Sequence, residues 1–203
     1  MALVSAALEN DIASAFKSMG DGDNKVFSQK ISAAVKKFSE SGTVTTVDAG
    51  AISAGAFTGA GTGGIEVDDS ICEEIIYAAC TAMDSMGSGG NAFLAEQLAI
   101  GIHSMVSAGN VETDVNGTAI TASSPPVTIP VSGKATGSMA GVPAPMQAAF
   151  TAAFNSMDNM TEGGDDYLAQ QMATAIDAYH KASAINTNGS AALAGSIGTG
   201  AME

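Results

Sequence analysis

The 203-residue chain contains no arginine and no tryptophan, and all seven of its basic residues are lysines. Acidic residues number 21, which gives a formal net charge of −14. Nucleic-acid binding depends on clustered Lys and Arg side chains that contact phosphates. The same positive clusters bind anionic membrane surfaces. We therefore expect neither a nucleic-acid nor a membrane partner.

Long apolar runs and large side chains are also scarce. The longest uninterrupted apolar stretch is Ile75–Cys80, whereas a membrane-spanning helix needs about 20 apolar residues. Hydrophobic residues make up 46% of the chain, but 38 residues are Ala and only 5% are aromatic. No basic residue precedes Lys17, so we expect no signal peptide.

Residues suited to catalysis are few. Cys72 and Cys80 are expected on one helix, about 12 Å apart, which is too far for a disulfide, so we expect two buried thiols. His103 and His180 have no nucleophile or base beside them in the sequence. We predict no catalytic residue, no metal and no cofactor, and hence no enzyme.

A glycine-rich segment, Gly59–Gly64, has the G-x-G-x-G spacing of some phosphate-binding loops. A phosphate loop requires a helix N-terminus, and in many cases a lysine, directly after the glycines. Here the acidic residues Glu66, Asp68 and Asp69 follow. Because acids repel phosphate, we do not expect a nucleotide site.

Internal repetition is the most informative feature of the chain. Residues 16–46, 83–113 and 157–187 align without a gap. Each aligned window leads into a glycine-rich segment, at 59–63, 133–137 and 195–200. Apolar residues occupy equivalent positions in the three windows: Phe16, Met83 and Met157; Phe27, Leu94 and Leu168; Ile31, Leu98 and Met172; Val35, Ile102 and Ile176; Phe38, Met105 and Tyr179.

Each unit is predicted to contain two helices and a strand. Phe27, Ile31, Val35 and Phe38 recur at helical spacing, residues 71–86 indicate the preceding helix of the second unit, and 44–47 alternate as a strand does. We predict an α+β, mainly helical fold of three tandem helix–turn–helix–strand repeats, packed as a pseudo-threefold body or alternatively as a linear row of hairpins. The repeats are expected at 1–64, 65–141 and 142–203.

The second repeat carries a proline-rich insertion at 121–132. Proline lacks the N–H that a central strand donates, so we predict an edge strand or a surface arm here. Lysines on the first repeat form a second candidate contact surface, provided that they share one face. The candidate interaction residues are Pro125, Pro126, Val127, Ile129, Pro130 and Val131 in the insertion, and Lys30, Lys36 and Lys37 in the first repeat.

Ser28–Gly64 and Gln170–Ala201 each combine a helix, a short Val/Thr strand and a G-x-G-x-G close. Acidic, triplicated units of this kind, rich in Ala, Gly, Thr and Ser, resemble small virion structural proteins of tailed bacteriophages. The resemblance implies a non-enzymatic role in the capsid shell (decoration), neck, tail or baseplate. It also implies synthesis in the host cytoplasm, and contacts with other virion structural proteins or with copies of itself.

A second function class remains open from the sequence alone. A pocket between helical hairpins would suit a small-molecule-binding module or a small enzyme. A ligand that raises the melting temperature would favour this alternative.

Overall fold

The computed structural model describes residues 5–19, 24–157, 160 and 162–203. In these residues, two helices followed by two strands occur three times in succession. The helices are α1 (Ser5–Met19), α2 (Asn24–Ser41), α3 (Ser70–Met83), α4 (Gly90–Ala108), α5 (Ala144–Met157) and α6 (Gly164–Ala182). The strands are β1 (Val44–Ile52), β2 (Gly55–Glu66), β3 (Asn110–Ile120), β4 (Thr128–Ala140), β5 (Ala184–Gly189) and β6 (Ser196–Met202), with a 3₁₀ turn, η1 (Ala191–Leu193), before β6.

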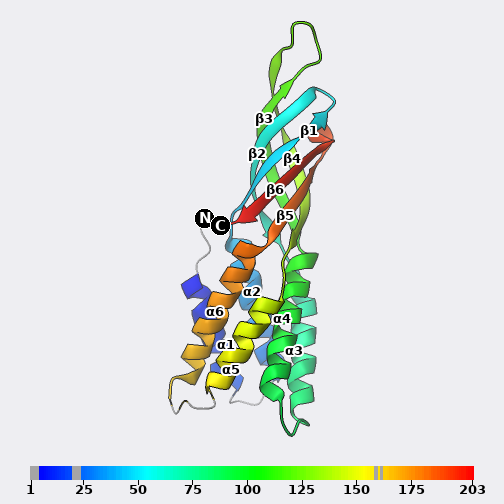
Figure 1. Cartoon of the computed structure of the whole chain (residues 1–203). Helices are drawn as coiled ribbons and strands as arrows, with labels where there is room; N and C mark the ends of the chain where they lie inside the picture. The colour runs from blue at the N-terminus through cyan, green and yellow to red at the C-terminus, as the bar shows by residue number, and fades with distance from the viewer. Residues whose placement is uncertain (1–4, 20–23, 158–159, 161) are drawn as a thin grey trace.

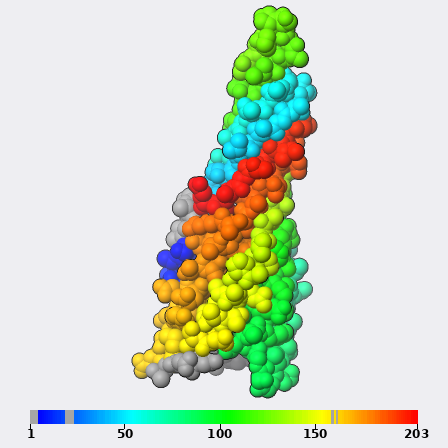
Figure 2. Space-filling model, in the orientation of Figure 1, coloured from blue at the N-terminus to red at the C-terminus, as the bar shows by residue number. Residues whose placement is uncertain are grey.

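The helices form a closed ring at one end of an elongated molecule (Figures 1 and 2). Each helix packs against the next one in the chain, and α6 packs against α1. The apolar stripes expected from the sequence point into this ring. Phe27, Ile31 and Val35 of α2 are fully buried, and each such side chain contributes about 1.5–3 kcal/mol to stability.

The strands form one closed antiparallel barrel that continues from the helices (Figure 1). Every strand pairs with the next, and β1 pairs with β6 from Val44↔Met202 to Gly50↔Ser196. Side chains alternate between the barrel interior and the solvent along each strand. Closure leaves no unpaired strand edge where all six strands run side by side.

The predicted fold class is therefore wrong. The strands do not close three separate helix–turn–helix–strand bodies, because β2 pairs with β3 and β4 pairs with β5 across the expected repeat boundaries. A linear row of hairpins is also wrong, since α1 packs on α6 and β1 pairs with β6. The physical reason is that a single hairpin has two unpaired edges, which are satisfied only when all the strands share one sheet.

Two apolar clusters fill the interior. The main core lies inside the helix ring and extends into the base of the barrel through residues such as Val44, Val111 and Ile185. A smaller group, here called the distal cluster, lies farther along the barrel and consists of Ile52, Phe57, Val115, Ala119, Ala135 and Leu193.

Glycine-rich strands allow the barrel to be narrow. An eight-stranded barrel has just enough room for interior side chains, so a six-stranded one has less. A Cβ atom on Gly63, Gly137 or Gly200 would lie 1.9, 1.8 and 1.8 Å from a carbonyl oxygen of the neighbouring strand. The glycines of the G-x-G-x-G segments thus allow neighbouring strands to lie close together.

Candidate functional site

The β3–β4 hairpin projects beyond the other strands at the end of the molecule opposite the helices (Figure 1). Its last pair is Ile120↔Thr128, and residues 121–127 form the loop at its tip. Ile120 and Val127 are 53% and 51% exposed, and Pro125 and Pro126 are also exposed. The tip thus presents apolar surface to solvent.

The predicted insertion at 121–132 divides into this loop and the start of β4. Ile129 and Val131 point inward and pack against the distal cluster. Pro130 faces solvent opposite Thr118 of β3. The ladder with β5 begins only at Ala135, so the described strands pair with β4 on one side only over 128–132. Pro130 therefore lies on a strand edge, where a missing N–H costs no ladder bond.

The three candidate lysines do not share one surface. Lys30 and Lys37 line a shallow depression between α1 and α2, where the Lys37 Nζ lies 2.7 Å from Asp11 Oδ2. Lys36 points to the start of α3 instead: it pairs with Glu40 at 2.6 Å and donates to the Val67 carbonyl. Exposed pairs of this kind contribute about 0–1 kcal/mol each.

A serine–histidine pair lies inside the helix ring, near the ends of α2 and α6 that lead into the barrel. Ser39 Oγ and His180 Nε2 are 2.8 Å apart, and both residues are fully buried. His180 Nδ1 lies 2.8 Å from the Ile176 carbonyl, which can only accept, so Nδ1 carries the proton. Burial lowers the pKa of His180, so Nε2 accepts from Ser39. Because the core encloses both groups, the pair joins α2 to α6 and presents no nucleophile to a substrate.

Acidification is expected to destabilise the protein through His180. Its pKa is lowered from 6.5 by burial, so the unfolded chain binds a proton that the folded chain rejects. Stability should therefore fall as the pH drops below about 6.5, by up to about 1.4 kcal/mol per pH unit. In His180→Leu, the Ser39 hydroxyl loses the His180 acceptor and can donate instead to the Val35 carbonyl, 2.9 Å from its Oγ. Thermal unfolding between pH 5.5 and 7.5 should show this slope in the wild type only. An equal slope in both proteins would contradict the assignment.

The remaining reactive groups are enclosed. Cys72 and Cys80 are buried free thiols on α3, as expected, and burial raises their pKa values to about 12 and about 11. Such thiols are not thiolates at neutral pH and make poor nucleophiles. Within the described ranges, His, Cys, Asp and Glu side chains do not gather in threes as a metal site would require. None of the described helices is long and apolar enough to cross a membrane.

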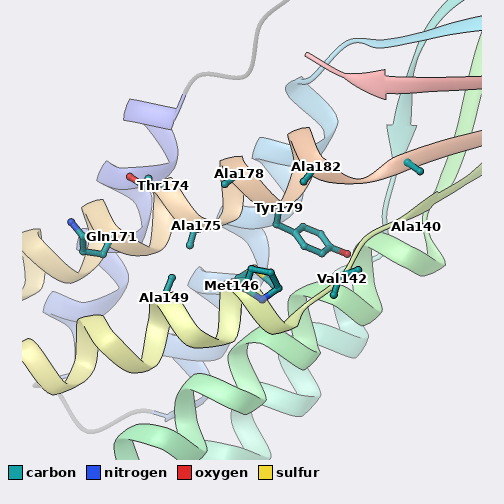
Figure 3. A pocket seen from close by; sticks show the side chains of 12 residues that line it. Ala140, Val142, Met146, Ala149, Gln171, Thr174, Ala175, Ala178, Tyr179 and Ala182 are labelled. Atoms are coloured by element: carbon teal, nitrogen blue, oxygen red, sulfur yellow. The ribbon is translucent and has the colours of Figure 1, made fainter.

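A groove of about 650 Å³ lies between α5 and α6 (Figure 3). Alanines make up half of its lining residues, with Gln171 and Thr174 at its polar end. The hydroxyl of Tyr179 is 2.8 Å from His103 Nδ1, and burial raises the pKa of Tyr179 to about 12. The alternative function, a small-molecule-binding module or a small enzyme, would have its pocket between hairpins, whereas this groove lies within the α5–α6 hairpin. That function stays a prediction.

Comparison with protein-family models, with curated proteins and with solved structures finds no match to this chain.

Proposed function

We propose that the chain is a non-enzymatic structural protein of a tailed-phage virion. It acts by contact with other virion structural proteins or with copies of itself, in the capsid shell, neck, tail or baseplate. The composition and the elongated outline (Figure 2) support this role. So does the burial of Ser39, His180, Cys72 and Cys80.

The observation that carries the proposal is the projecting β3–β4 tip. Its exposed apolar residues, Ile120 and Val127, lie at the extreme end of the molecule, where a partner meets little hindrance from the rest of the chain. Burial of such side chains at an interface is the main source of affinity in protein–protein contacts. The tip is thus the part of the chain that we expect to insert into a partner.

The edge of β4 supplies a second means of contact. Residues 128–132 pair with β3 on one side only. An edge of this kind accepts an added strand from a partner, with main-chain hydrogen bonds giving affinity. Pro130 interrupts that edge, which limits unspecific strand pairing.

Replacing residues 121–127 by Asn-Gly, which removes Val127 and both exposed prolines, is expected to weaken docking without unfolding the chain. A two-residue turn joins the paired positions Ile120 and Thr128, and Ile129 and Val131 stay on the distal cluster. Circular dichroism should show an unchanged helix signal, with a melting temperature within about 4 °C of the wild type. Cosedimentation with phage particles assembled without the chain should fall at least ~10-fold.

The matched control is Val142→Ser, which removes another exposed apolar side chain (69% exposed) beside the α5–α6 groove. This variant should bind particles as the wild type does. Full binding by the tip replacement would refute the role of the tip, and loss of the helix signal would show that the loop belongs to the core.

A further inference from the structure

A polar layer crosses the barrel between the main core and the distal cluster. It consists of Thr46 and Asp48 on β1, Thr113 on β3 and Thr187 on β5. All four side chains point into the barrel and are 0–3% exposed. The threonines occupy equivalent positions in the three aligned sequence windows. The three threonines are therefore a repeated feature of the sequence, and Asp48 adds a carboxylate to the layer from β1.

Most of the oxygen atoms in this layer lack hydrogen-bond partners. The Thr46 hydroxyl donates to Asp48 Oδ2 at 2.7 Å. Within the part of the chain that the structure describes, Asp48 Oδ1, Thr113 Oγ1 and Thr187 Oγ1 have no partner. Buried polar atoms are nearly always satisfied, and a buried carboxylate needs a compensating positive charge.

Within the described residues, no cationic side chain supplies that positive charge. The chain has no arginine, and none of its seven lysines, all of them described, is buried. His180 is buried, but its two ring nitrogens contact Ser39 and the Ile176 carbonyl. A cation bound from solution would supply the compensating charge.

Two glycines bring the oxygen atoms together. A Cβ atom on Gly198 would lie 2.2 Å from Asp48 Oδ1 and 2.3 Å from Thr187 Oγ1. A Cβ atom on Gly61 would lie 2.3 Å from Thr46 Oγ1 and 3.0 Å from Thr113 Oγ1. Asp48 Oδ1 and Thr187 Oγ1 thus lie near one point, and the Thr46 and Thr113 hydroxyls lie near another. The two oxygens of one such pair are close enough to share one ion at the metal–oxygen distance of ~2.4 Å that is typical of hard cations.

We propose that the polar layer binds one monovalent cation of the size of Na⁺, with Asp48 Oδ1 and the Thr187 hydroxyl as ligands. Carboxylate and hydroxyl oxygens are the ligands that hard cations prefer. A monovalent ion neutralises the single carboxylate, whereas a divalent ion would leave a buried positive charge. Thr46 acts as a positioning residue because it holds the other carboxylate oxygen.

Thermal unfolding of the full chain in NaCl and in choline chloride at equal ionic strength tests this site. The wild type should melt at least ~3 °C higher in NaCl, with a rise that saturates as the Na⁺ concentration increases. Asp48→Asn should lose this difference. Asp114→Asn, which removes an exposed carboxylate from the outer face of β3, should keep it. Equal melting temperatures in the two salts, or a larger rise with CaCl₂, would overturn the proposal.

Thr187→Val provides a second route if Asp48→Asn does not fold. It removes one proposed ligand and retains the carboxylate, so the Na⁺ dependence should weaken. Crystals soaked in a thallium(I) salt provide a direct readout. An anomalous peak within bonding distance of Asp48 Oδ1 is expected, and density for water alone at that position would overturn the proposal.

Discussion

Deletion of residues 195–203, which removes β6, is expected to unfold the whole chain and not only its last third. β6 lies between β1 and β5, so its loss leaves both neighbours with unpaired edges inside a formerly closed barrel. Met202 also leaves the main core. A loss of more than about 5 kcal/mol is expected, which is comparable to the total stability of many domains.

Circular dichroism during heating measures this effect. The truncated chain should show no cooperative transition, or one at least ~20 °C below that of the wild type. The control is Ile197→Ser, which changes an outward side chain of β6 that is 60% exposed and should leave the transition in place. If two-thirds of the helix signal still melted at the original temperature, the three units would fold independently. That result would contradict the closed barrel.

Gly137→Ala is expected to break the pairing of β4 with β5. The new methyl group would lie 1.8 Å from the Asn186 carbonyl oxygen and 2.7 Å from the Thr187 Cα. Both atoms belong to the backbone, so a strand has to move. We expect a cost of about 3 kcal/mol or more, larger than most overpacking substitutions.

The control for this substitution is Gly64→Ala, since a Cβ atom at Gly64 meets nothing within 4 Å. Differential scanning calorimetry should show a melting temperature at least ~6 °C lower for Gly137→Ala and nearly unchanged for Gly64→Ala. Similar melting temperatures for the two variants would contradict the close approach of β4 and β5.

The helical part of the fold could be predicted because its signal is local. Phe27, Ile31 and Val35 recur at helical spacing, and all three are fully buried in the ring. Barrel closure could not be predicted in this way. The pairing of Val44 with Met202 joins residues from opposite ends of the chain, and neither strand alone specifies its partner.

The candidate site was predictable only in part. The prolines correctly indicated a strand edge, and the structure places Pro130 on one. The polar layer was missed, although a signal existed: Thr46, Thr113 and Thr187 are equivalent, and each lies two residues after an apolar residue of its strand. The contact of Ser39 with His180 had no such signal, because their equivalent in the second window is Val106.

We propose that the chain acts in the virion by contact with other structural proteins. Quantitative mass spectrometry of gradient-purified phage particles tests this role, with the soluble fraction of the same lysate as reference. The chain should be retained in the particles at a fixed ratio to the other structural proteins. Complete, infectious particles without the chain, with all of it left in the soluble fraction, would rule this role out.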